Sequence, residues 1–275
     1  MSWRHSLVSL ACFAAVAAAA EAPKPPAEMT AADIVACVRG NLPRESMTQN
    51  VRMTSIDQKK IEHVLEAEIV WQRNPETQLS NVLLTFDAPP ELRGASVLVL
   101  EKQPQNDMFM FQPTYGKTRR ITAHAVQGKL MGTDFTLEDF ERLHGMVATL
   151  EGKRRADAMV GDRKTFVTEA APGDAGSEYA RIVSRIDQDT CVPLEVELFT
   201  ADGDAPAKRM TSDPKSVTKE KSGFLPREIS MVDLRHETRT SIVIEKLEVD
   251  VPIDQKTFSA AELDRRGRFS SAPTR

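Results

Sequence analysis

The sequence predicts a mainly β protein with a few helices, built on one antiparallel sheet. Apolar and polar residues alternate repeatedly with a period of two, and clusters of Pro, Gly, Asn and Asp separate the alternating segments. The composition is that of a globular protein, with 41% hydrophobic and 28% charged residues in a chain of 275. No linker divides the chain, so we expect one domain over residues 30–265 and a disordered tail over residues 266–275.

Residues 1–20 predict a signal peptide that is cleaved near Ala20. Arg4 and His5 precede an uninterrupted apolar stretch, which ends in three alanines that suit a signal peptidase. We therefore expect an exported protein. The 36 Lys and Arg residues nearly balance the 40 Asp and Glu residues, and this balance argues against a nucleic-acid partner.

The mature chain is predicted to begin with an extended leader and a short helix. Residues 21–29 are rich in proline and in charged side chains, and this composition favours an extended segment. Thr30 stands three residues before Asp33, as in a capping box, and an apolar face with helical spacing follows. Gly40 and Asn41 are expected to end this helix.

The strands follow from the period-two segments. The clearest covers residues 63–71, where Leu65, Ala67, Ile69 and Trp71 share one face. The same alternation recurs in residues 82–86, 96–100, 192–198 and 242–251.

The middle of the chain predicts a helical insertion between residues 123 and 145. Thr136 precedes acids at positions suited to a helix N-terminus, and Phe140 lies on the apolar side. A sheet with an N-terminal helix and this internal helix has two segments with which to cover an apolar face. We expect the internal helix to act as a lid.

Cys37 and Cys191 are the cysteines that remain after cleavage. In an oxidising compartment they form a disulfide, or they are two small buried hydrophobic residues, and the sequence leaves both interpretations open. The histidines are scattered, and no metal-binding spacing occurs, so we expect neither a metal nor a cofactor.

Charged residues near the insertion are the remaining candidates for chemistry. Asp134 and Asp139 suit general acid and base catalysis, but their positions also suit a turn and a helix N-terminus. Arg119 and Arg120 could bind an anionic group of a ligand, or they could form an ion pair with Asp134 or Asp139. No nucleophile elbow, phosphate loop or zinc motif is present, so we predict a protein that is not an enzyme.

Three motifs in order resemble the outer-membrane lipoprotein-sorting protein family, relatives of the LolA and LolB carriers. They are DMFMFQP at residues 107–113, TRRI at residues 118–121 and MGTDFTLED at residues 131–139. Flanking matches extend the resemblance and include an expected closing strand pair that ends in Phe258 and Leu263. The chain departs from the family at Phe109 and Phe111, where Trp and Tyr are usual, and at Thr133, where Ser is commoner.

The resemblance implies a deeply curved, incomplete antiparallel β-barrel whose concave apolar face is closed by helices. It implies a periplasmic carrier that holds the acyl chains of a lipid or lipoprotein and moves them towards the outer membrane. A transporter of the resistance-nodulation-division type in the inner membrane is the implied partner. The candidate cavity lining, chosen from the marked apolar faces, is Trp71, Phe86, Leu98, Leu100, Met108 and Met110.

Two other functions compete with the carrier. One is a periplasmic adaptor subunit of a transporter that holds no lipid. The other is a hydrolase that uses Asp134 and Asp139.

Overall fold

The structure, a computed structural model, describes residues 24–103, 105–122, 126–146, 152–172 and 176–270. The predicted signal peptide, residues 1–20, lies outside these ranges. Residues 26–28 of the predicted extended leader instead form a turn of 3-10 helix.

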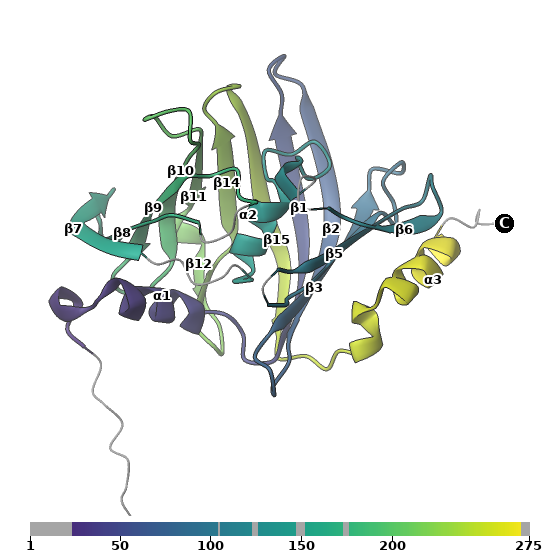
Figure 1. Ribbon diagram of the computed structural model, residues 1–275, viewed down its shortest axis with the longest axis horizontal. Coiled ribbons are helices and arrows are strands. Elements are labelled where there is room, and N and C mark those ends of the chain that lie inside the picture. The colour runs from purple at the N-terminus through teal and green to yellow at the C-terminus, as the bar shows by residue number, and fades with distance from the viewer. Residues whose placement is uncertain (1–23, 104, 123–125, 147–151, 173–175, 271–275) are drawn as a thin grey trace, which may run out of the picture.

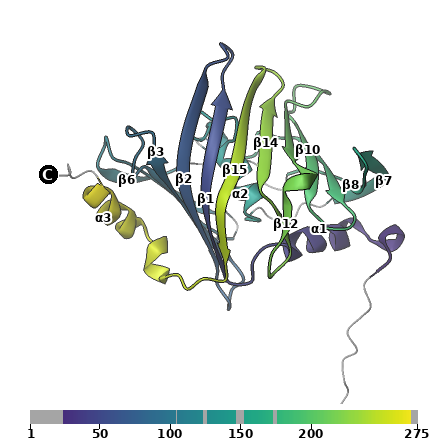
Figure 2. The same ribbon diagram turned by 180° about the vertical axis from the view of Figure 1, so that it is seen from behind.

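Within the described ranges, thirteen strands form one large antiparallel sheet that does not close into a barrel (Figures 1 and 2). The strand order is β6-β5-β4-β3-β2-β1-β15-β14-β11-β10-β9-β8-β7, which leaves β6 and β7 as the edges. The strand bounds are β1 Ser46–Ile56, β2 Glu62–Arg73, β3 Ser80–Ala88, β4 Ser96–Leu100, β5 Asp107–Gln112, β6 Lys117–Arg120, β7 Gly152–Val160, β8 Arg163–Ala170, β9 Arg181–Asp187, β10 Pro193–Phe199, β11 Lys208–Ser212, β14 Glu228–Asp233 and β15 Thr238–Val249. A separate hairpin pairs β12 Val217–Lys219 with β13 Phe224–Pro226. The predicted fold class is confirmed.

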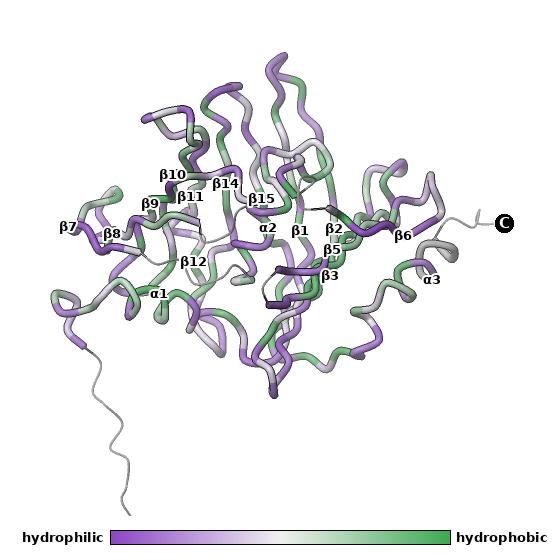
Figure 3. Tube along the Cα trace, in the orientation of Figure 1, coloured by the Kyte–Doolittle hydropathy of each residue, from purple (hydrophilic) through white to green (hydrophobic). Residues whose placement is uncertain are grey.

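Hydrophobic and hydrophilic residues alternate along many of the strands (Figure 3). In β1, Met47, Val51 and Met53 are buried, whereas Asn50 and Arg52 between them are exposed. An antiparallel sheet with one solvated face requires this alternation, because successive side chains point to opposite faces.

Both predicted capped helices are present. Helix α1 (Ala31–Gly40) carries the expected capping box between Thr30 and Asp33. Helix α2 (Leu137–Leu143) carries the same box between Thr136 and Asp139. Helix α2 lies in front of the sheet in Figure 1, on the side around which the strands curve.

The C-terminal segment differs from the expected strand pair. Residues Gln255–Phe258 form a 3-10 helix, and α3 (Ala260–Ser270) follows, so the predicted domain end at residue 265 falls inside a helix. Phe258 and Leu263 are buried against one face of β2 to β5, together with Phe111. Residues 271–275 of the predicted tail lie outside the described ranges.

This C-terminal cover accounts for the two-sided apolar strand β5. Met108 and Met110 pack with the core on the α2 side of the sheet, whereas Phe109 and Phe111 pack with the cluster under α3. Helices α1 and α3 lie at opposite ends of the sheet (Figure 1). Within the described ranges, no helix combines the length and the apolar character that crossing a membrane requires.

Candidate functional site: an apolar cavity under a helical cover

A cavity of about 340 Å³ lies between the curved sheet and the segments that cover it. This volume is within the range that small-molecule sites occupy. The sheet side is lined mainly by apolar residues, among them Met47, Val51, Met53, Ile69, Ile182, Val196, Leu198, Met210, Met231, Ile242 and Ile244.

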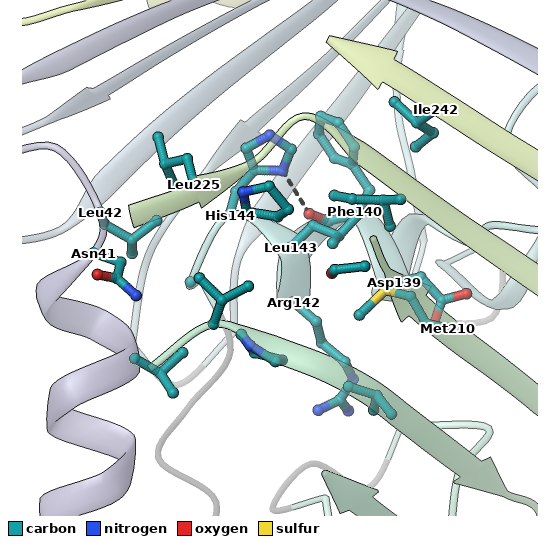
Figure 4. Close-up of a pocket in the computed structure, with 18 of the residues that line it drawn as sticks. Asn41, Leu42, Asp139, Phe140, Arg142, Leu143, His144, Met210, Leu225 and Ile242 are labelled. Atoms are coloured by element: carbon teal, nitrogen blue, oxygen red, sulfur yellow. Dashed lines mark hydrogen bonds between the residues drawn. The ribbon is translucent and has the colours of Figure 1, made fainter. Parts of the chain in front are cut away.

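Three segments form the cover of the cavity: the second half of α1 with the residues that follow it, α2 with His144 and Gly145, and strand β13 of the β12–β13 hairpin. They contribute Val38, Leu42, Phe140, Leu143 and Leu225 to the lining. Figure 4 shows these segments converging on the cavity, with Leu42 and Leu225 on one side and Phe140 and Met210 on the other.

Asn41 joins two parts of this cover to the sheet. Its Nδ2 donates to the carbonyl oxygen of Thr190 at 2.9 Å, and its Oδ1 accepts from the backbone N–H of Phe224 at 3.0 Å. Gly223 lies so close that a Cβ atom there would stand 2.5 Å from Asn41 Oδ1 and 2.6 Å from Asn41 Cα. The hairpin therefore approaches α1 as closely as it does because residue 223 has no side chain.

A disulfide holds α1 to the turn between β9 and β10. Cys37 and Cys191 are bonded, with their Cα atoms 5.8 Å apart, and they pack with the buried side chains of Ile34, Phe166 and Ile186. Of the two interpretations that the sequence left open, the structure has the bonded one.

Asp139 holds the N-terminus of α2 in a buried polar network. Its Oδ2 accepts from the backbone N–H of Thr136 at 2.9 Å and lies 3.4 Å from Lys208 Nζ. Its Oδ1 accepts from the hydroxyl of Tyr179 at 2.9 Å. Burial, together with the nearby carboxylates, raises the pKa of Tyr179 well above its usual range, so the tyrosine stays a donor. Lys208, 2% exposed, also pairs with Glu178.

Asp134 lies in a second buried network. It accepts hydrogen bonds from the hydroxyls of Thr238 and Thr240, and Lys129 Nζ lies 3.2 Å from its Oδ1. Its backbone N–H donates to Thr240 Oγ1 at 2.9 Å. These contacts join the loop before α2 to β15, so both acids that suited catalysis are engaged in holding the cover in place.

His144 is the C-cap residue of α2, and it lines the cavity. Its Nδ1 lies 2.8 Å from the carbonyl oxygen of Phe140, and the two rings are in contact, tilted by 48° with centroids 4.4 Å apart. The side chain is buried, and this burial lowers the pKa of His144 to about 4. The imidazole is therefore neutral at pH 7.

None of the six residues predicted to line the cavity does so. Trp71, Phe86 and Met108 are buried in the core on the α2 side of the sheet, and Met110 packs against that core. Leu98 and Leu100 face the opposite side and pack in the cluster under α3. The prediction followed the most apolar strands, but β2 to β5 are covered on both faces, and the cavity lies mainly over β1, β15, β14 and β9 to β11, with Ile69 contributed by β2.

The predicted lid residues are divided. Asp139 and Phe140 line the cavity, and Asp134 supports the loop before α2. Arg119 and Arg120 lie on edge strand β6 instead, where Arg119 stacks over Tyr115 and Arg120 pairs with Asp107. Neither arginine pairs with Asp134 or Asp139, because each has a local partner on β5 or in the turn between β5 and β6.

Sequence reasoning missed the lining from β1 and the hairpin. The alternation of Met47, Gln49, Val51 and Met53 marks one face of a strand and was the available signal. Residues 217–226 give no comparable signal, because their place over the cavity depends on the contact with Asn41. The described residues contain no group of three or more His, Cys, Asp or Glu side chains arranged to hold a metal ion.

Comparison with known proteins supports the fold. A family model described as "Uncharacterized protein" matches residues 78–265. No curated protein matches the chain.

Three solved structures share the fold over 84% of this chain. A putative outer membrane lipoprotein-sorting protein domain from Vibrio parahaemolyticus is 18% identical, with a TM-score of 0.76 and 97% of its length covered. A DUF1329 family protein from Desulfovibrio piger is 17% identical, with a TM-score of 0.78 and 96% covered. A LolA superfamily protein from Nitrosomonas europaea is 16% identical, with a TM-score of 0.66 and 98% covered. The resemblance found in the sequence is thus confirmed at the level of the LolA-like fold.

Proposed function

We propose that this chain, which belongs to the family whose model matches residues 78–265, is a periplasmic carrier that binds acyl chains of a lipid or lipoprotein. The cavity of about 340 Å³, apolar in most of its lining, is the observation that carries the proposal. The predicted signal peptide supports export, and one structure with the same fold is described as a lipoprotein-sorting domain.

The physical need for such a carrier follows from the cost of exposing hydrocarbon to water. Burial gains about 0.8 kcal/mol per methylene group, so a sixteen-carbon chain gains roughly 12 kcal/mol on leaving water. An acyl chain therefore crosses an aqueous compartment only with its apolar surface shielded. The cover supplies that shield, and it consists of short elements whose displacement would open the cavity.

The proposal includes no catalysis. Asp134 and Asp139 are each held by several hydrogen bonds within the protein, and this favours a supporting role over a chemical one. The cargo moves towards the outer membrane, and a transporter of the resistance-nodulation-division type is the partner that the family resemblance suggests. The adaptor without cargo remains the competing function.

Lipid binding is tested by extraction and by a matched pair of variants. Protein purified from its native host is extracted with organic solvent, and delipidated protein is titrated with a fluorescent fatty acid. Ile244 lines the cavity, whereas Val243 beside it on β15 is 37% exposed on the other face. We expect Ile244→Trp to weaken fatty-acid binding at least tenfold and Val243→Trp to leave it unchanged.

Clean extracts together with no fatty-acid binding would contradict the carrier. If such protein still captured a membrane transporter, the adaptor function would be supported instead.

A further inference from the structure

The polar side chains in the cavity wall indicate which hydrogen-bonding groups a ligand carries in addition to its hydrocarbon chain. Several polar side chains of the lining are paired within the protein: Asn41 with Phe224 and Thr190, Asp139 with Tyr179, and Arg142 with Glu138, although Nε of Arg142 is buried without a partner in the described residues. His144 and Gln49 are different.

The hydrogen bond of His144 fixes which of its ring nitrogens carries the proton. A backbone carbonyl oxygen only accepts, so Nδ1 must donate to Phe140 across the 2.8 Å contact. A neutral imidazole has one N–H, and Nε2 is therefore the acceptor. Figure 4 shows the ring beside Phe140, with its second nitrogen turned away from that carbonyl.

Nε2 of His144 has no hydrogen-bond partner in the part of the chain that the structure describes. The side chain is only 6% exposed, and it stands in a wall made largely of aliphatic residues. A hydrocarbon occupant would take this acceptor away from the water of the cavity without offering a donor, and a ligand that brings a donor removes that cost.

Gln49 provides a second, independent observation. It interrupts the apolar stripe of β1 between Met47 and Val51, is 7% exposed and lines the same cavity. The one hydrogen bond that the described residues give its amide is to the sulfur of Met47, at 3.2 Å, and a thioether is a weak acceptor. A purely hydrocarbon occupant would leave both Gln49 and His144 without a good partner.

We propose that the cavity ligand carries an N–H or O–H group that donates to Nε2 of His144. The site then selects amide-linked or hydroxylated acyl chains over acyl esters and plain hydrocarbon. This inference rests on the proposed carrier function and adds the chemical class of the cargo.

The test compares two probes of nearly equal shape, N-methyldodecanamide and methyl dodecanoate, which differ in an N–H against an oxygen. The dissociation constants are measured for the wild-type protein and for His144→Asn, whose amide N–H is placed to donate to Phe140 as Nδ1 does. Because the amide is also harder to desolvate, the readout is the ester-to-amide ratio of dissociation constants. We expect this ratio to fall about fivefold in His144→Asn.

Controls separate this inference from the carrier function. His63→Asn changes an exposed histidine outside the cavity and should leave the ratio unchanged. Dodecanol, tested in parallel, shows whether a hydroxyl serves as well as an amide. Equal ratios in wild type and His144→Asn would overturn the inference and leave the carrier intact, whereas failure of all probes to bind wild type would overturn both.

A measurement on the wild-type protein covers the case in which His144→Asn does not fold. The ¹⁵N resonance of Nε2 in His144 should shift when the amide binds and stay near its unliganded value when the ester binds. The same response to both ligands would contradict a donor at this nitrogen.

Discussion

Removing the disulfide between Cys37 and Cys191 is expected to lower the free energy of unfolding and leave the fold intact. The bond joins residues 154 positions apart, so it restricts a large part of the unfolded chain. The loop-entropy relation gives about 5 kcal/mol for a loop of this length, and measured disulfides more often contribute about 2–4 kcal/mol. We therefore expect Cys37→Ala/Cys191→Ala to lose between about 2 and 5 kcal/mol.

The fold should survive because α1 has other attachments. Ile34 is fully buried against the sheet, the capping box at Thr30 is independent of the cysteines, and Asn41 holds the end of the helix. Urea denaturation followed by circular dichroism gives the loss in free energy. Hydrogen exchange of the α1 amides shows whether the helix stays in place.

A reducing agent provides the control. It should destabilise the wild type to about the level of the double variant and leave the double variant unchanged. A loss below about 1 kcal/mol in the double variant would refute the loop-entropy reasoning, and loss of protection throughout α1 would refute the claim that its other contacts suffice.

Three further predictions concern the cover of the cavity. Asp139→Ala leaves a buried lysine without one of its carboxylates and should cost about 3–5 kcal/mol in urea denaturation, whereas Thr30→Ala, at an exposed cap, should cost about 1 kcal/mol. Because burial lowers the pKa of His144 to about 4, the free energy of unfolding should fall with pH more steeply in the wild type than in His144→Asn. We expect the extra loss to be about 3 kcal/mol between pH 6.5 and pH 4. Gly223→Ala should cost about 1–3 kcal/mol, and Gly203→Ala almost nothing, in thermal unfolding.

The sign of the pH effect follows from the neutral state that the fold requires. Burial depresses the folded-state pKa of His144, so its contribution to stability is complete above the unfolded value near 6.5 and is lost as the pH falls. If the free energy of unfolding changed with pH in the same way in the wild type and in His144→Asn, this effect would be contradicted. If Asp139→Ala and Thr30→Ala lost the same free energy of unfolding, the stabilising role of the buried network at Asp139 would be contradicted. If Gly223→Ala and Gly203→Ala lost the same stability, the close approach of residue 223 to Asn41 would be contradicted.

Local patterns in the sequence were enough to predict the elements. Both capped helices begin where Thr30 and Thr136 stand three residues before an acid, because a capping box uses only neighbouring residues. The period of two likewise predicted strands, since alternate side chains of a strand face opposite sides wherever the strand lies. The C-terminal helix was missed, because Phe258 and Leu263 were expected to end a closing strand pair, whereas the structure places them in helical segments.

The sequence by itself determined that this chain forms a sheet with apolar faces and two capped helices able to cover them. Only the tertiary structure decided where a space remains. Trp71 and Phe86 lie on strand faces as apolar as those that carry Val51 and Ile244. Trp71 and Phe86 are nevertheless buried in the core away from the cavity, whereas Val51 and Ile244 line it. A cavity is space that side chains do not fill, so its position depends on how the whole sheet curves and on which segments cross it, and no local pattern encodes that.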